Sequence, residues 1–135
     1  MKLLIDTHIW IWWVSRDPQL RPSDGLRIAS VEEVAVSAIS IWEVAMLQQS
    51  QRIELSSPIE EWLDIALTGA GIQVQPLGRS IAFKAATLPF HHRDPADRLI
   101  IASALCMDCS LLSYDRKFRL YSELGERLIS KGTPE

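Results

Sequence analysis

The chain has 135 residues, of which 47% are hydrophobic and 23% charged, and its formal net charge is −3. This length predicts one domain with a substantial hydrophobic core, and the net charge argues against nonspecific nucleic-acid binding by the whole surface. It does not exclude a nucleic-acid enzyme, because metal ions can neutralise an acidic site. We expect no membrane span, because no apolar run approaches roughly 18 residues. Asp6 and His8 interrupt the N-terminal apolar stretch, so no signal peptide is expected either.

The two cysteines, Cys106 and Cys109, form a lone C-x-x-C pair. Zinc sites of this kind need a second ligand pair, and the sequence has none at suitable spacing. A redox pair needs a helix N-terminus to lower the thiol pKa, whereas this pair falls near a helix end. We therefore expect buried free thiols in a reducing, cytoplasmic setting.

The N-terminal segment predicts a short strand at residues 2–5 and a helix from Thr7 or His8 to Val14. The strand is an apolar run that ends abruptly in Asp6, as buried parallel strands often do. The helix is apolar on every side, which indicates burial on more than one side. Its three tryptophans exceed what one core face usually takes, so we expect at least one to contact another subunit or protein. The alternative is that all three lie in the core; they are Trp10, Trp12 and Trp13.

Short apolar segments then alternate with helical patterns. Strands are expected at 34–37, 72–75 and 110–113, with a weak final element at 127–129, and helices at 21–30, from Ser40, at 58–68, 78–88 and 95–107. Such alternation predicts an α/β fold with right-handed crossovers, in which a parallel sheet is covered by helices on both faces. We expect a strand order of about 3-2-1-4 with a possible fifth short strand, a domain spanning residues 1–130 and a loose tail at 131–135.

Acidic residues fall beside the strand ends, and each has a purely structural alternative. Asp6 follows the first strand but could cap the next helix. Ser40 and Glu43 follow the second strand but read as an S-x-x-E capping box. Asp94 suits a helix N-cap and Asp97 the third helical position, with Pro95 between them. Asp115 follows the fourth strand without a clear helix to cap, although a turn role is possible.

The joint pattern is more informative than any one acid. In the expected strand order, strands one, two and four are neighbours, so Asp6, Glu43, Asp97 and Asp115 converge on one crevice at the sheet edge. Clustered carboxylates repel one another unless a cation neutralises them, and oxygen ligands with room for water suit Mg²⁺ or Mn²⁺. We expect the helix N-terminal placement of Glu43 and Asp97 to keep both ionised.

At this point the sequence resembles a known family. The segments that carry the likeness are Leu3–His8, Ser40–Glu43, His92–Ala102 and Ser113–Phe118. Together they resemble the PIN-domain ribonucleases, and among those the VapC-type toxins of prokaryotic toxin–antitoxin pairs, over essentially the whole chain. The resemblance implies a Mg²⁺- or Mn²⁺-dependent endoribonuclease that uses a metal-activated water, is neutralised by a small VapB-like antitoxin and is usually a homodimer.

The resemblance also assigns residues. Asp6, Glu43, Asp97 and Asp115 match the family's catalytic, metal-binding acids, and Thr7 matches a polar residue that orients a carboxylate or water. Asp94 is an additional acid that supports the site or caps its helix. Arg98 contacts an RNA phosphate in one interpretation and pairs with Glu43 or another acid in the other. The expected non-ligands are His8, taken as structural, and His91 and His92, taken as solvent-facing loop residues.

Three other functions are compatible with acids at strand ends. A receiver-like Mg²⁺-binding signalling module would have a further acid beside the first-strand Asp and a Lys at a late strand end, and neither is found. A phosphatase would carry D-x-D after the first strand, where this chain has His8. A catalytically idle PIN-like RNA-binding domain would be expected to have lost some of the acids.

Overall fold

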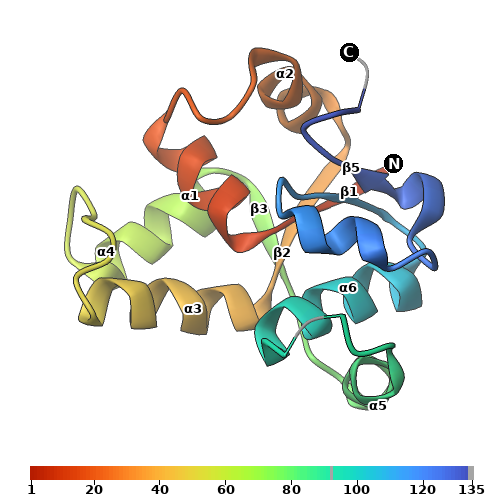
Figure 1. Cartoon of the computed structure of the whole chain (residues 1–135). Coiled ribbons are helices and arrows are strands. Elements are labelled where there is room, and N and C mark those ends of the chain that lie inside the picture. Colours follow the sequence, from red (N-terminus) through yellow and green to blue (C-terminus); the bar gives the residue numbers. More distant parts are fainter. Residues whose placement is uncertain (92, 134–135) are drawn as a thin grey trace.

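The computed structural model describes residues 1–91 and 93–133, and its elements alternate along the chain as predicted (Figure 1). The strands are β1 (Lys2–Ile5), β2 (Glu33–Ser37), β3 (Ile72–Gln75), β4 (Ser110–Leu112) and β5 (Leu128–Ile129). The α-helices are α1 (Thr7–Ser15), α2 (Pro22–Ser30), α3 (Ala38–Gln49), α4 (Ile59–Asp64), α5 (Arg79–Thr87) and α6 (Pro95–Met107). A π-helical segment, Ile65–Gly69, follows α4, and 3₁₀ segments lie at Arg116–Leu120 and Gly125–Arg127.

The strands form a parallel sheet whose order, among the described residues, is β3-β2-β1-β4-β5. Central β1 carries Leu4 opposite Ala35 of β2 and opposite Leu111 of β4. The predicted α/β class and the order 3-2-1-4 are confirmed, and the weak final element is a fifth strand beside β4. This order puts the carboxyl ends of β1, β2 and β4 at one edge of the sheet.

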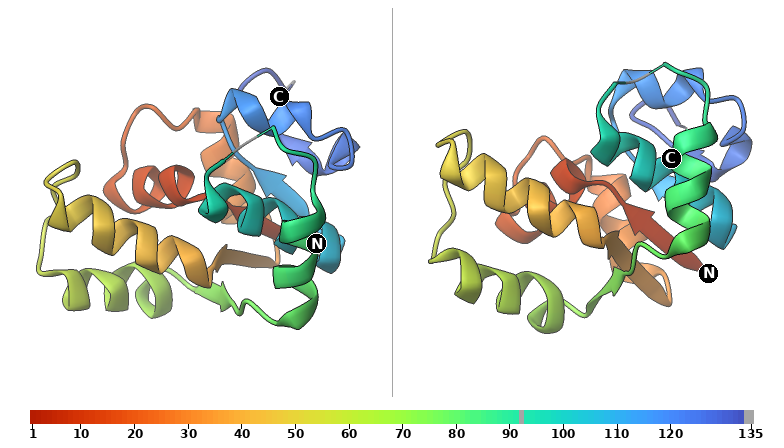
Figure 2. Two further views of the ribbon diagram at one scale, coloured as in Figure 1. Left: turned by 60° about the horizontal axis from the view of Figure 1, so that its bottom comes forward. Right: turned by 90° about the horizontal axis from the view of Figure 1, so that it is seen from below.

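Helices cover both faces of the sheet, and Figure 2 shows α3 and α4 on one side with α5 and α6 on the other. Alternate residues of β1 point to opposite faces. Leu3 and Ile5 pack into the core under α1, α3 and α4, whereas Leu4 packs against α5 and α6. Burial on both faces explains why the strands read as continuous apolar runs.

The tryptophans of α1 divide between the core and the surface. Trp10 is fully buried, its indole N–H donates to the Ala66 carbonyl at 3.0 Å, and its ring lies 5.0 Å from that of Trp62. Trp12 and Trp13 are only half-buried. Trp10 therefore belongs to the domain's own core, and the expected contact with another chain rests on Trp12 or Trp13.

The helix after β2 begins earlier than the sequence pattern predicted. It starts at Ala38, and its N-cap is Ser37, whose hydroxyl accepts a hydrogen bond from the Ile39 amide at 3.2 Å. The interpretation of Ser40 and Glu43 as a capping box is therefore wrong. The physical reason is that β2 passes into α3 without a loop, so the last strand residue also serves as the cap.

The chain after β4 also differs from expectation. Asp115 does precede a helical segment, because its carboxylate accepts a hydrogen bond from the Lys117 amide at 2.9 Å and caps the 3₁₀ segment Arg116–Leu120. The carbonyl groups of Lys131 and Thr133 accept hydrogen bonds from the Arg21 guanidinium. The expected loose tail at residues 131–135 stays a prediction. Residues 134–135 lie outside the described part of the chain.

The cysteines and the helix lengths bear on two further expectations. Cys109 is buried as a free thiol, but Cys106 is exposed on α6, so the expectation of two buried thiols is wrong for Cys106. Among residues 1–91 and 93–133, every helix is too short or too polar to cross a bilayer.

A buried carboxylate ties α2 to the exit of β4. Asp24 has no exposed surface and accepts hydrogen bonds from Arg21 Nε at 3.0 Å, from Arg27 Nε at 3.2 Å and from the Tyr114 hydroxyl. Tyr114 is the residue before Asp115. The contact therefore fixes the segment that carries one of the predicted site acids.

We predict that Asp24→Asn lowers the free energy of unfolding by roughly 3 kcal/mol. This is the lower end of the range for breaking a buried ion pair, because both arginines keep some contact with solvent. The measurement is urea unfolding of both proteins. Asp108→Asn is the matched control, because its ion pair with Arg127 is exposed and should contribute less than about 1 kcal/mol. Equal losses in the two variants would contradict the importance of the Asp24 contact.

Candidate metal-binding site

Asp6, at the end of β1, forms hydrogen bonds with α1, with β4 and with the residue that follows β4. Its Oδ1 accepts a hydrogen bond from the Ile9 amide of α1 at 2.9 Å, and its Oδ2 accepts one from the Ser113 hydroxyl. Its own backbone N–H donates to the Leu112 carbonyl of β4 at 3.1 Å. Asp6 therefore caps α1 and lines the candidate site at once, so the two interpretations of this residue are compatible.

Ser113 connects two of the predicted acids. It is fully buried, its hydroxyl donates to Asp6, and the same oxygen accepts a hydrogen bond from the Asp115 amide at 3.1 Å. One hydroxyl thus sets the position of both residues. The sequence analysis gave Ser113 no role in the site, although this residue opens the segment Ser113–Phe118 that carries part of the family resemblance.

Glu43 is oriented by a hydroxyl pair. The Thr7 hydroxyl is hydrogen-bonded to the Glu43 carboxylate and to the Ser40 hydroxyl, the latter at 2.8 Å. Thr7 and Ser40 are both buried. The S-x-x-E spacing thus places Ser40 and Glu43 on the same side of α3, where both reach the start of α1. Sequence reasoning had assigned Ser40 to a helix cap and missed this contact.

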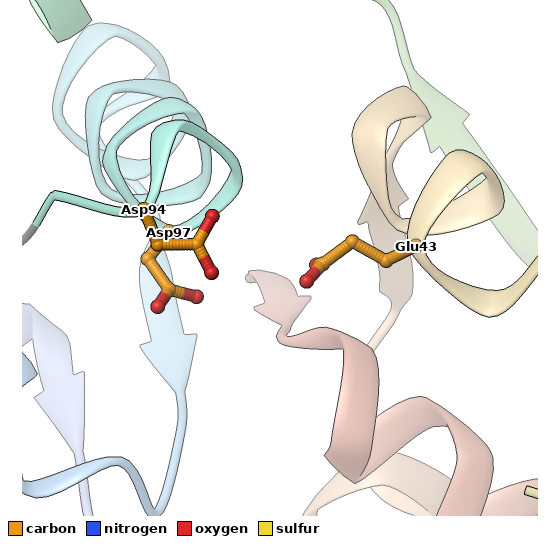
Figure 3. Close-up of side chains that lie close together, drawn as sticks. All are labelled: Glu43, Asp94 and Asp97. Carbon is orange, nitrogen blue, oxygen red and sulfur yellow. The ribbon is translucent and has the colours of Figure 1, made fainter. Parts of the chain in front are cut away.

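Three carboxylates come together between α3 and α6. Glu43, Asp94 and Asp97 each offer an oxygen that lies within 4.8 Å of the other two. Figure 3 shows Asp94 and Asp97 projecting from the start of α6 toward Glu43 on α3. Asp94 also caps α6, because its Oδ1 accepts a hydrogen bond from the Ala96 amide at 3.0 Å. Asp94 is therefore both the expected helix cap and one of the three clustered carboxylates.

One cavity contains every predicted acid. It has a volume of about 420 Å³, and its lining is Asp6, Thr7, His8, Trp12, Glu43, Asp94, Asp97, Tyr114 and Asp115. The acids come from the end of β1, from α3, from the start of α6 and from the segment after β4. Their convergence follows from the strand order, which makes β1, β2 and β4 adjacent.

Burial and mutual repulsion raise the pKa of three acids in the cavity. Burial first, and then the charges of Asp94, Asp115, Glu43 and Asp6, raise the pKa of Asp97 from 3.8 to about 8. Burial also raises the pKa of Asp6 and of Glu43, although hydrogen bonds from Ser113 and Thr7 oppose the change. The expectation that helix N-termini keep Glu43 and Asp97 ionised is therefore wrong for Asp97 in the metal-free protein, and for Glu43 burial acts against it. Glu43 lies in the second turn of α3, and for Asp97 burial and like charges outweigh the helix dipole.

These properties fit a divalent cation. The candidate ligands are carboxylate oxygens, which hard ions such as Mg²⁺ and Mn²⁺ prefer. The positive charge of an ion would relieve the repulsion that raises the pKa of Asp97. Glu43, Asp94 and Asp97 are the group that could hold the ion, with Asp6 and Asp115 in the same cavity.

Arg98 serves a structural role. It is 6% exposed, and its guanidinium donates hydrogen bonds to the carbonyls of Ala85, Leu88 and Pro89 at 2.7, 2.8 and 2.9 Å. It also lies 4.4 Å from the centre of the Phe90 ring. A cation at this place satisfies carbonyl groups at the end of α5. These contacts engage the guanidinium, and the expected contact of Arg98 with an RNA phosphate or a site acid stays a prediction.

The histidines lie in different surroundings. His8 lines the cavity, and its ring centre is 5.8 Å from that of Trp12. His91 is exposed, as expected, and its ring meets the edge of Tyr121 at 4.9 Å. His92 lies outside the described residues, so its expected exposure stays a prediction.

Comparison with protein families and characterised relatives gives a consistent result. The family model described as "PIN domain" matches residues 3–124. Ribonuclease VapC22 of Mycobacterium tuberculosis is 35% identical over 119 residues, which cover 87% of this chain and 89% of that protein.

Solved structures share the fold. The structure of VapBC2 from Rickettsia felis bound to a promoter DNA fragment has a TM-score of 0.70 and 19% identity, and the match covers 96% of this chain and 98% of that one. A toxin–antitoxin complex from Klebsiella pneumoniae has a TM-score of 0.65 and 19% identity, over 94% of this chain and 95% of that one. At this identity the likeness establishes the fold alone.

We predict that Asp97→Asn makes the metal-free protein more stable at high pH but not at low pH. An acid whose pKa rises from 3.8 in the unfolded chain to about 8 in the folded one keeps its proton only in the folded state between these values. Stability therefore falls as pH rises through this window. Asn mimics the protonated acid and avoids that loss. Melting temperatures measured in a chelator should agree near pH 4 and diverge above pH 8, with the variant higher.

The control for this experiment is Asp64→Asn, the same chemical change at an exposed position of α4. In this control, the melting temperature should change between pH 4 and pH 8 by the same amount as in the unmodified protein. A melting temperature of Asp97→Asn that tracks the unmodified protein at every pH would show that Asp97 is not strained by burial and repulsion.

Proposed function

This chain belongs to the PIN-domain family, and on that premise we propose that it is a metal-dependent endoribonuclease that hydrolyses phosphodiester bonds of RNA. The observation that supports this most directly is the convergence of Asp6, Glu43, Asp97 and Asp115 on one cavity. The likeness to a protein named a ribonuclease, at 35% identity over most of both chains, supports the same activity. The proposed catalytic domain spans residues 1–130.

The proposed cofactor is Mg²⁺ or Mn²⁺, held by Glu43, Asp94 and Asp97 with Asp6 and Asp115 close by. When bound, such an ion polarises a phosphoryl oxygen and lowers the pKa of a bound water, which supplies the nucleophile. The chain's own contribution is to hold oxygen atoms in place. Ser113 and the Ile9 amide fix Asp6, and Thr7 fixes Glu43.

The acids also control protons and access. Because the pKa of Asp97 is raised to about 8, this acid carries a proton near neutral pH in the metal-free site, and metal binding must release it. Without a cation, the ionised acids would repel the phosphates of RNA. We therefore propose that the site binds RNA only when the cation is present. The proposed location of the protein is the cytoplasm, where its RNA substrate lies.

The complete set of acids also bears on the alternatives. An idle PIN-like RNA-binding domain would not need Asp6, Glu43, Asp97 and Asp115 in one partly buried cavity, because their clustering costs stability. A receiver-like signalling module is disfavoured by the family match over residues 3–124.

For partners, we propose a VapB-like antitoxin and a second copy of this chain. Solved toxin–antitoxin complexes share the fold, which supports the first. Exposed aromatic side chains support association in general, because Phe83 and Phe90 are 72% and 80% exposed. At least one of Trp12 and Trp13 remains the proposed contact on α1. An antitoxin that extends a basic side chain toward the acids would inhibit by electrostatics as well as by blocking access.

We predict that Asp6→Asn lowers RNA cleavage at least about 100-fold, because metal-based charge stabilisation contributes several kcal/mol. Asn can still cap α1 through its carbonyl oxygen, so the fold should persist. The measurement is cleavage of single-stranded RNA with Mg²⁺ or Mn²⁺, alongside Mn²⁺ binding by calorimetry, which should weaken. The control is Asp17→Asn, which removes an acid outside the cavity. Full activity in folded Asp6→Asn protein would refute the assignment of this residue.

A separate prediction concerns self-association. Sedimentation at micromolar concentration should give a mass near twice the 15.3 kDa of one chain. A structure of that dimer or of an antitoxin complex should place Trp12 or Trp13 in a contact between chains. A strict monomer, with both indoles uncovered in the antitoxin complex as well, would rule out this proposal.

A further inference from the structure

One wall of the acidic cavity is aromatic. His8, Trp12 and Tyr114 line the same cavity as the acids. Their rings are neighbours, with centres 5.8 Å apart for His8 and Trp12 and 5.9 Å apart for Trp12 and Tyr114. The chemistry proposed above uses the carboxylates and hydroxyls of the cavity and gives these rings no part.

Packing explains these rings only in part. Trp10, on the same helix, is fully buried and has a partner for its indole N–H. Trp12 and Tyr114 touch the core but are only half-buried, and both line the cavity. Large aromatic groups that face a polar cavity leave apolar surface in water, which a ligand with a flat apolar face would cover.

The Tyr114 ring is held in a fixed orientation. Its hydroxyl donates to Asp24, which is fully buried, and accepts a hydrogen bond from the Arg21 amide at 3.1 Å. Burial and the contact with Asp24 raise the pKa of Tyr114, so the phenol stays a neutral donor. A ring fixed before the ligand arrives loses little conformational entropy on binding.

The position beside the acids suggests what the ring surface binds. A metal ion at Glu43, Asp94 and Asp97 would attract a phosphate, but the cavity as a whole is acidic and offers the rest of a nucleotide little electrostatic attraction. Nucleobases stack on Trp, Tyr and His side chains, and only unpaired bases expose their faces for this. A cavity of about 420 Å³ is within the range of sites for small ligands.

We propose that His8, Trp12 and Tyr114 form a nucleobase-binding wall on which an unpaired base next to the cleaved phosphate stacks, with Trp12 as the main contact. This inference rests on the proposed endoribonuclease function and adds to it the side chains that position the base beside the cleaved phosphate. The acids act on the phosphate, and the wall fixes the position of the nucleotide beside it.

The test uses a set of short single-stranded RNAs in which one nucleotide, at a different position in each RNA, lacks its base but keeps its sugar and phosphate. The protein itself is unchanged. Removing the stacked base should lower kcat/KM about 5- to 150-fold, which corresponds to about 1–3 kcal/mol of stacking, and should act mainly through KM. Deletions farther along the strand should have little effect. The sensitive positions should be one or two nucleotides beside the cleaved bond.

The same substrates are then measured with Trp12→Leu. This variant should cleave the intact RNA as poorly as the unmodified protein cleaves the base-deleted one, and the base deletion should no longer matter. Trp12→Phe should restore most of the effect because it keeps a ring. Trp42→Leu is the matched control, since Trp42 is exposed on α3 and lines a different groove. Melting temperatures show which variants are folded.

Two outcomes distinguish a failure of the base-stacking proposal from a failure of the endoribonuclease proposal. If every base-deleted RNA is cleaved like the intact one, or if folded Trp12→Phe and Trp12→Leu keep the full base effect, the wall is refuted and the endoribonuclease stands. If the unmodified protein cleaves no RNA with Mg²⁺ or Mn²⁺, the endoribonuclease proposal fails and the wall falls with it.

Discussion

The repulsion among partly buried carboxylates is the constraint on which the site depends. Asp6, Glu43, Asp94, Asp97 and Asp115 lie in or beside one cavity, and burial together with like charge raises the pKa of Asp97 to about 8. A fold that gathers acids in this way gives up stability in the absence of a cation. Hydrogen bonds from Ser113, Thr7 and the backbone hold Asp6 and Glu43 in place and offset part of this loss of stability.

The supporting contacts join segments that are far apart in sequence. Ser113 reaches Asp6 across 107 positions, and Tyr114 reaches Asp24 across 90. These contacts converge on the segment after β4, which carries Asp115 of the acidic cluster and Tyr114 of the aromatic wall. This segment therefore supports one member of each part of the cavity, and the Tyr114–Asp24 contact ties it to α2.

Helix capping and site chemistry are not alternatives in this protein. Asp6 caps α1, Asp94 caps α6 and Asp115 caps a 3₁₀ segment, while all three line the cavity. A carboxylate that caps a helix uses one oxygen to accept a hydrogen bond from the backbone, and the same side chain can still line a cavity. A capping signal in the sequence is therefore no argument against a role in the site.

The sequence by itself determined the strands, the α/β class and the acids at the strand ends, because apolar runs, helical spacing and strand-end carboxylates are local signals. The expected strand order proved correct, but no local signal fixes it. The sequence did not reveal that Ser37 rather than Ser40 caps α3, that Arg98 is bound to the end of α5, or that Ser113 and Asp24 support the site. It also did not settle whether Asp97 is ionised. Those features depend on contacts across long stretches of chain and on burial, and only the tertiary structure decides both.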